Sequence, residues 1–166
     1  MNPPSDIVPQ FVSAAREYRL IIDQATALSP RQFLVVVQTT LARLYSLALL
    51  LPDADPTTDV ESPGRFSPDD WRQLYDRLSG HLGSSDFYWM VFDPIDPDDH
   101  ESIRHTLADD LSDIYRDLEH ASVEREFTAD ALWSLRFSFE MHWGHHAVDA
   151  LTAIHSLLYG PHALGE

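Results

Sequence analysis

The chain of 166 residues contains no cysteine and no lysine. Without cysteine it has no disulfide framework, no thiolate nucleophile, no iron–sulfur cluster and no structural zinc ribbon. Without lysine it has no Schiff-base catalysis and no phosphate-binding loop built around a lysine. The six glycines form no Gly-x-Gly-x-x-Gly pattern. These absences exclude thiol chemistry and the standard nucleotide-binding loops.

Positive charge is scarce as well. The eleven cationic residues are all arginine and face 27 acidic residues, which gives a formal net charge of −16 and an isoelectric point near 4.7. Such a surface repels nucleic-acid phosphates and anionic lipid head groups, so we do not expect nucleic-acid binding. The hydrophobic fraction of 44% excludes a disordered acidic tail and predicts a folded protein with the charge on its surface.

Neither a leader nor a membrane anchor is predicted. The first residues, Met-Asn-Pro-Pro-Ser-Asp, lack a basic region followed by an apolar stretch, and we therefore expect a cytoplasmic protein. The longest apolar stretch, Phe33 to Leu51, carries Arg43 near its middle. An arginine at that depth costs about 2.5–3.5 kcal/mol on insertion scales, so we interpret this stretch as a buried core helix.

Proline and glycine divide the chain into helical stretches, and no run of β-branched residues alternates with period two. The sequence predicts one all-α domain over residues 1–166, an up-and-down antiparallel bundle of about five helices. Serine or threonine at residues 29, 67 and 128 supplies helix-start signals. The expected helices cover about residues 6–28, 29–51, 67–81, 98–119 and 129–159, with residues 52–66 as an exposed loop and 160–166 as a tail.

The aromatic segment from Phe87 to Phe92 is too short for its secondary structure to be assigned from periodicity. A buried helical turn and an extended plug both fit it. We expect its rings to lie in the core, because aromatic side chains contribute large buried areas. Exposed rings would instead indicate a partner surface.

Two stretches near the end of the chain have a distinctive composition. They read DDLSDIYRDL over residues 109–118 and, after Trp133, RFSFEMHWGHH over residues 136–146. With the steps Leu44-Tyr45 and Tyr88-Trp89, they resemble a bacterial family of proteins with a domain of unknown function, number 5063. The resemblance extends over about residues 28–159, and it implies a helical bundle and no particular activity.

Polar side chains flank the apolar stripes of the last two expected helices. At about 100° per residue, Asp110, Asp113 and Asp117 fall within about 60° of one another, whereas Asp109 and Arg116 are expected to face solvent. If the two helices pack antiparallel, these carboxylates face a polar band on the last helix. That band comprises Ser138, His142, His145 and Asp149, with His146 at its edge.

We favour a structural interpretation of these aspartates. Arg43 is the only charged residue between Gln32 and Pro52. A buried charge without a partner costs several kcal/mol, so we expect Arg43, with Arg136 as a second cation, to pair with the aspartates. The predicted polar cluster comprises Arg43, Asp110, Asp113, Asp117, Arg136, His142, Trp143 and His146.

A divalent metal site is the alternative interpretation. Carboxylates and imidazoles on facing helices form the di-iron and related sites of helical bundles. The spacing matches no standard motif, because no glutamate stands three residues before any histidine at 142, 145 or 146. The candidate ligands are Asp110, Asp113, Asp117, His142, His145 and Asp149.

No nucleophile can be assigned, because no serine lies in a Gly-x-Ser-x-Gly elbow. We expect a non-catalytic acidic binding or interaction module that contacts a partner protein or a second copy of the chain. The first alternative is a divalent-metal-binding protein, extending to a metal-assisted hydrolase that uses Asp113, His142 and a bound water. The second alternative is an acidic mimic that occupies a nucleic-acid-binding protein.

Overall fold

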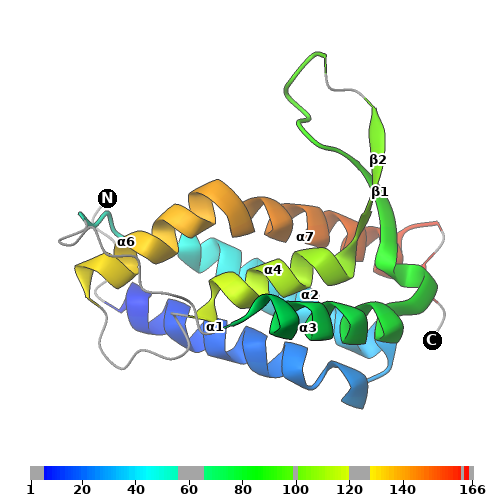
Figure 1. Ribbon diagram of the computed structural model, residues 1–166, viewed down its shortest axis with the longest axis horizontal. Coiled ribbons are helices and arrows are strands. Elements are labelled where there is room, and N and C mark those ends of the chain that lie inside the picture. Colours follow the sequence, from blue (N-terminus) through cyan, green and yellow to red (C-terminus); the bar gives the residue numbers. More distant parts are fainter. Residues whose placement is uncertain (1–5, 56–65, 99–100, 120–127, 162, 165–166) are drawn as a thin grey trace.

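Antiparallel helices form the body of the protein, and one β-hairpin projects from it (Figure 1). The computed structural model describes residues 6–55, 66–98, 101–119, 128–161 and 163–164. The prediction of an all-α bundle is confirmed, with the hairpin as an addition. The helices are α1 (Ile7–Asp23), α2 (Pro30–Ala48), α3 (Pro68–Leu82), α4 (Leu107–Asp117), α6 (Ala129–Ser138) and α7 (Gly144–Tyr159), and the strands are β1 (Phe87–Val91) and β2 (Ser102–Thr106).

Side-chain caps set the starts of three helices where the sequence predicts them. Ser29 accepts from the backbone N–H of Gln32, whose side chain accepts from the Ser29 N–H, and Ser67 forms the same capping box with Asp70. Proline follows each serine at the first helical position, where its missing N–H costs nothing. The hydroxyl oxygen of Thr128 caps α6 by accepting from the backbone N–H of Ala131. These starts are local properties of the chain.

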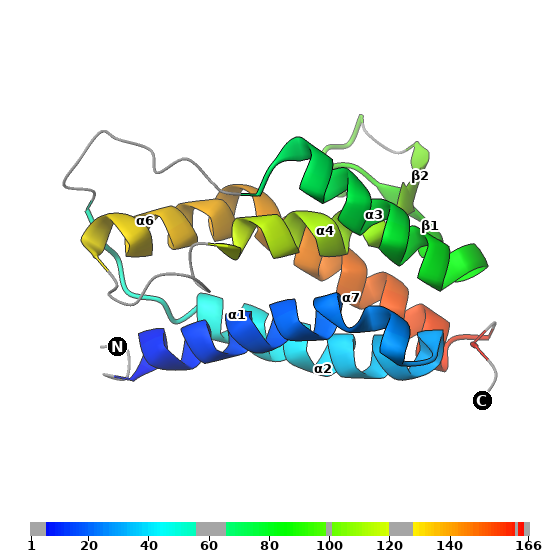
Figure 2. The same ribbon diagram turned by 60° about the horizontal axis from the view of Figure 1, so that its bottom comes forward.

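The core lies where α1 and α2 pack against α4 and α7 (Figure 2). Each fully buried large side chain contributes about 1.5–3 kcal/mol from its removal from water. The buried hydroxyl of Tyr18 donates to the carbonyl oxygen of Leu111 at 3.0 Å, which satisfies it inside the core. A search of the described helices for a stretch with the length and hydropathy of a membrane span finds none.

The helix predicted over residues 98–119 is wrong in its first half. Residues 102–106 form β2, which pairs antiparallel with β1, and α4 begins only at Leu107. Thr106 ends the strand and caps the helix, with its hydroxyl oxygen 3.4 Å from the N–H of Asp109. Ile103, which fits the apolar stripe of a helix, is an exposed strand residue. Strand pairing joins distant residues, so local periodicity does not report it.

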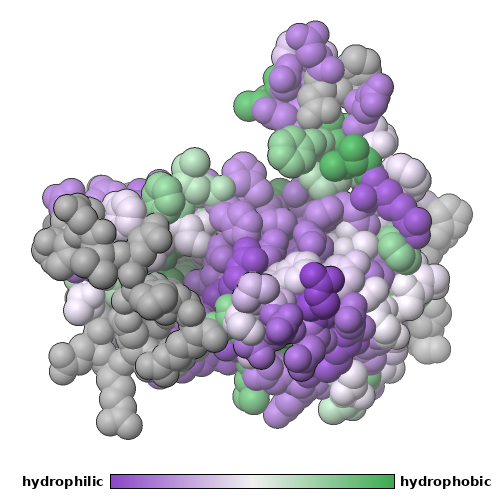
Figure 3. All heavy atoms as spheres, viewed as in Figure 1, coloured by the Kyte–Doolittle hydropathy of each residue, from purple (hydrophilic) through white to green (hydrophobic). Residues whose placement is uncertain are grey.

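The aromatic segment predicted to lie in the core is largely exposed on the hairpin. The side chains of Trp89 and Phe92 are 70% and 76% exposed. Alternate residues of a strand point to opposite faces, and the adjacent Tyr88 points back to α4. Figure 3 shows hydrophobic side chains on the hairpin above a mostly hydrophilic face of the bundle. The core prediction is wrong here because the strands leave the bundle.

The helix predicted over residues 129–159 is present, but it contains one π-helical segment, Phe139–Trp143, between α6 and α7. A π turn accommodates one extra residue and so rotates the helix that follows it. A Cβ atom added at Gly144 would lie 2.4 Å from the carbonyl oxygen of Phe139. The glycine is therefore required by this turn of its own helix.

The two irregular segments are described in part. Of the predicted loop, residues 52–55 have no regular secondary structure and residue 66 precedes α3, whereas residues 56–65 lie outside the described residues. In the tail, the carbonyl oxygen of Leu164 accepts from Arg31 at 2.8 Å. The N–H of Leu164 donates to the carbonyl oxygen of Leu157, so this part of the tail packs back on the bundle.

Candidate metal centre

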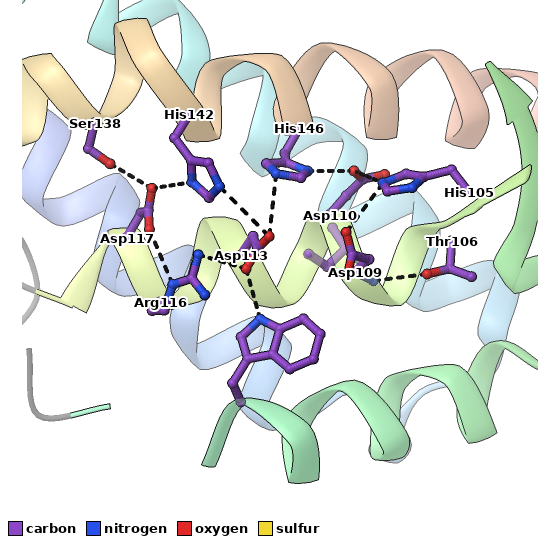
Figure 4. Close-up of polar contacts among 12 residues, drawn as sticks. His105, Thr106, Asp109, Asp110, Asp113, Arg116, Asp117, Ser138, His142 and His146 are labelled. Carbon is purple, nitrogen blue, oxygen red and sulfur yellow. Dashed lines mark hydrogen bonds and ion pairs between the residues drawn. The ribbon is translucent and has the colours of Figure 1, made fainter. Parts of the chain in front are cut away.

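Carboxylates of α4 face imidazoles of the last helix along one side of the bundle (Figure 4). Asp110, Asp113 and Asp117 lie about one turn apart on α4, and His142 and His146 lie about one turn apart on the facing helix. The hairpin adds one more histidine from β2. We call this set the Asp/His seam: His105, Asp109, Asp110, Asp113, Asp117, His142 and His146.

The first ligand group of the seam comprises His105, Asp109, Asp110 and His146. The Nε2 atom of His105 lies 3.1 Å from Oδ1 of Asp110 and 3.3 Å from Oδ2 of Asp109. Nδ1 of His146 lies 2.8 Å from the same Oδ1 of Asp110. The four ligand atoms, one from each residue, all lie within 4.8 Å of one another. Strand β2, the first turn of α4 and helix α7 thus converge on one small volume.

Asp110 is the most buried member of the seam, with no exposed surface. Its second oxygen, Oδ2, accepts from the hydroxyl of Tyr88 at 2.6 Å. Burial, together with the charge of Asp110, raises the pKa of Tyr88 well above its ordinary value, so the hydroxyl stays protonated and donates. A buried carboxylate needs such donors, and Tyr88 leaves Oδ1 free for the two histidines.

The histidines of this group hold their protons strongly. The hydrogen bond to Asp110 raises the pKa of His105. Burial acts to lower the pKa of His146, but the hydrogen bond to Asp110 and the charges of Asp110 and Asp113 outweigh it, and the pKa is raised. Burial raises the pKa of Asp109, and the nearby charge of Asp113 adds to the rise. The group therefore binds protons when no other cation is present.

Asp113 joins the first group to a second one. Its Oδ2 atom lies 3.4 Å from Nε2 of His146 and 3.9 Å from Nε2 of His142. Its other oxygen, Oδ1, accepts from the indole N–H of Trp71 at 2.8 Å and lies 2.9 Å from the guanidinium of Arg116. The second ligand group comprises Asp113, His142 and His146, whose ligand atoms also lie within 4.8 Å of one another.

Asp117 closes the seam at its far end. Its Oδ2 atom accepts from Nδ1 of His142 at 2.8 Å and from the hydroxyl of Ser138 at 2.6 Å. Burial acts to raise the pKa of Asp117, but these hydrogen bonds outweigh it, and the pKa falls below its ordinary value. Arg116 adds a longer ion pair of 3.5 Å. Asp117 therefore stays ionised and holds the ring of His142 in place.

The π turn brings the polar residues of the last helix onto one face. Eight α-helical residues rotate by about 800°, which is about 80° beyond two turns. The π turn takes up one extra residue, so the rotation from Ser138 to His146 equals that of seven α-helical residues, about 700°. This is within about 20° of two full turns, so the two side chains lie on nearly the same face. The same shift leaves His145 exposed on the outside of α7. A wheel of constant pitch therefore misplaces both histidines.

The predicted pairing of Arg43 and Arg136 with the aspartates is wrong. Arg43 is half exposed and pairs with Glu17 at 3.0 Å on the outer face of α2. That face also exposes apolar residues such as Val36, so apolar neighbours in the sequence do not imply burial. Arg136 pairs with Glu140 and donates to the carbonyl oxygen of residue 51. Arg116, which we expected to face solvent only, is the arginine that contacts the seam.

Four further predicted site residues do not join the ligand groups, and one of them is Asp117, which contacts His142 instead. Trp143 is fully buried in the core against Phe11 and Phe139, and it finds no hydrogen-bond partner for its indole N–H among the described residues. His145 is exposed, which removes it from the metal candidates. Burial and the charge of Asp110 raise the pKa of the half-buried Asp149, which lies beside the first group without contributing a ligand atom.

Sequence reasoning missed His105, Asp109, Tyr88 and Trp71. Asp109 is half-buried and approaches His105, although the helical wheel places it towards solvent. His105 and Tyr88 enter the site only because β1 and β2 pair, with these two residues opposite each other. The one signal in the sequence is the two-residue alternation of a strand, which directs Tyr88 inwards and Trp89 outwards. This signal can be used only once the segment is known to be a strand.

The fold and the seam define a helical-bundle protein with an Asp/His cluster between two of its helices. The family model described as "Domain of unknown function (DUF5063)" matches residues 2–160, and the chain belongs to this family. Among solved structures, protein BF1032 from Bacteroides fragilis is similar, with a TM-score of 0.81, 23% identity, and coverage of 97% of this chain and 98% of that chain. At this identity the likeness shows the fold alone. A search of curated proteins finds no match.

Proposed function

We propose that this protein binds a divalent transition-metal ion at the first ligand group, through His105, Asp109, Asp110 and His146. The proposal depends on one observation, the convergence of two imidazole nitrogens and two carboxylate oxygens within 4.8 Å of one another. Mixed nitrogen and oxygen ligands suit zinc, iron and manganese. The group has four protein ligands from three elements, and structural zinc sites also use four protein ligands.

The surroundings of the group support the proposal. Ligating histidines almost always donate their other ring N–H to a carboxylate, a backbone carbonyl or a water, and ligating carboxylates are hydrogen-bonded in turn. Nε2 of His146 faces Asp113 at 3.4 Å, and Tyr88 donates to the second oxygen of Asp110. Both contacts orient a ligand without occupying the atom that would bind the ion.

The excess of negative charge in the seam also supports the proposal. Within the described residues, the seam holds the carboxylates of Asp109, Asp110, Asp113 and Asp117, and one guanidinium, that of Arg116, pairs with them. Arg43 and Arg136, which we expected to neutralise them, lie elsewhere. A cation other than arginine is therefore needed, and protons on the histidines or a metal ion can supply it.

The interaction module expected from the sequence has weaker support. The rings of Phe87, Trp89 and Phe92 are 44%, 70% and 76% exposed. At about 150–250 Å² per aromatic side chain, their exposed parts amount to roughly 400 Å². A symmetric pair of hairpins would bury about 800 Å² of aromatic surface, below the roughly 1,200–2,000 Å² of stable interfaces. Partner binding and self-association therefore stay predictions.

The test is metal binding by chelator-treated protein, titrated separately with zinc, manganese and ferrous ions. We expect calorimetry and elemental analysis to detect at least one ion bound at the first group. A ligand at 100 times its dissociation constant stabilises the fold by about 2.7 kcal/mol, so the melting temperature rises. No bound ion and no thermal shift with any of the three metals would refute the proposal.

Matched variants locate the ion. His105→Asn and His146→Asn each remove one ligand and are expected to abolish tight binding, because each loses a nitrogen that faces Asp110. His145→Asn is the control, since this exposed histidine is adjacent in sequence and lies outside both ligand groups. Equal loss of binding in the control would point to adventitious binding by surface histidines.

A further inference from the structure

We propose that the Asp/His seam holds a second, solvent-accessible divalent ion, and that the ring of His146 bridges it to the first. This inference rests on the proposed function, because it needs an ion at the first ligand group. The second ion would be bound by the second ligand group, through Oδ2 of Asp113 and the Nε2 atoms of His142 and His146.

The distances of the second group suit a shared ion. Oδ2 of Asp113 lies 3.4 Å from Nε2 of His146 and 3.9 Å from Nε2 of His142. Two ligand atoms that each lie about 2.1 Å from one ion are about 3.0–4.2 Å apart, for bond angles from 90° upwards. The separation of 3.9 Å between Oδ2 of Asp113 and Nε2 of His142 is too long for a hydrogen bond. A cation between these two atoms would therefore not have to displace one.

His146 offers a different nitrogen to each group. Its Nδ1 atom faces Asp110 of the first group at 2.8 Å, and its Nε2 atom faces Asp113 of the second. Figure 4 shows the ring lying between the two carboxylates. An imidazole in this position is either a doubly protonated cation between two acids or, without protons, a bridge between two metal ions.

His142 is already oriented as a metal ligand. Its Nδ1 atom donates to Asp117 at 2.8 Å, and Ser138 donates to the same oxygen at 2.6 Å. This carboxylate–histidine pair directs the Nε2 lone pair of the neutral ring towards Asp113 and His146. Asp117, which contributes no ligand atom to either group, therefore has a role as the positioning residue of His142.

The second group is the more open of the two. The side chain of His142 is 42% exposed, which is more than that of any ligand in the first group, where Asp109 is 29% and His105 is 25% exposed. Three protein ligands with solvent access leave a coordination position for water or an exchangeable small ligand, as in catalytic zinc sites. The first group, with four ligands, has the pattern of a structural site.

Formal charge is compatible with two ions. Four carboxylates and the guanidinium of Arg116 leave the seam with three negative charges. One divalent ion leaves one negative charge. Binding one ion needs only the neutral imidazole of His146, whereas a ring that bridges two ions also gives up its second proton to solvent, and the resulting imidazolate charge balances the second ion. Arg116 contacts Oδ1 of Asp113, so Oδ2 is free for the second ion.

The experiment counts the ions. Chelator-treated full-length protein is titrated with zinc chloride by calorimetry and analysed for bound zinc after gel filtration. We expect two zinc ions per chain for the wild type and for His145→Asn, and one for His142→Asn. In Asp117→Asn the affinity for the second ion should fall about 10–100-fold and that for the first should stay unchanged. Circular dichroism checks that each variant is folded.

One zinc ion per chain in the wild type would overturn this inference and leave the proposed function intact, whereas no zinc would overturn both. Copper(II) tests the bridge. Two copper ions joined by one imidazolate are magnetically coupled, so the paramagnetic resonance signal per copper should be reduced in the wild type and restored in His142→Asn. Two bound copper ions with a full, uncoupled signal would refute the bridge by His146.

Discussion

The hydroxyl of Tyr88 provides a sharp test of how the seam is built. It donates at 2.6 Å to Oδ2 of Asp110, a carboxylate with no exposed surface, so water cannot replace the donor in Tyr88→Phe. A hydrogen bond to a charged group contributes about 1.5–3 kcal/mol, and the variant should lose about 2 kcal/mol of unfolding free energy. For a chain of this length, that loss lowers the melting temperature by roughly 4–8 °C.

The assay is thermal unfolding of metal-free protein, followed by circular dichroism in the presence of a chelator. Tyr159→Phe is the control, because the side chain of Tyr159 is exposed near the end of α7. We also expect Tyr88→Phe to weaken metal binding about 10–100-fold, as the loss of an outer partner of a ligand does. If Tyr88→Phe has the same melting temperature as the control and the same metal affinity as the wild type, the account of Asp110 as an oriented ligand is wrong.

Three further predictions concern pH, a glycine and an arginine. The raised pKa values of His105 and His146 mean that their pairs with Asp110 stabilise the metal-free fold fully below about pH 6.5, so its melting temperature should fall as the pH rises above that value. Zinc affinity should rise over the same range because protons compete with the metal, and a metal-free melting temperature that rises with pH would contradict the ion pairs. Gly144→Ala should destabilise by about 1–3 kcal/mol in urea unfolding, because its Cβ would collide with a carbonyl oxygen, and Gly80→Ala, with nothing within 4 Å, should stabilise by about 0.4–1 kcal/mol. Arg43→Ala removes an exposed ion pair and should change stability by about 0–1 kcal/mol, whereas a loss of several kcal/mol would restore the buried-arginine interpretation.

Capping residues and helical periodicity predicted most of the helices and one half of the seam. Caps at Ser29, Ser67 and Thr128 act within a single turn, so they can be recognised without any tertiary contact. The spacing of Asp110, Asp113 and Asp117 places them on one face of any regular helix. The acidic stripe of α4 and its position beside the core therefore follow from helical periodicity alone.

The residues that face the stripe depend on tertiary contacts. His105 reaches Asp110 through the pairing of β2 with β1, and strand pairing between distant residues leaves little local signal. The π turn decided that His146 points inwards and His145 outwards, because one extra residue rotates all that follows it. Arg43 lies away from the seam because burial depends on which face of α2 its neighbours cover, and hydropathy along the chain does not report that.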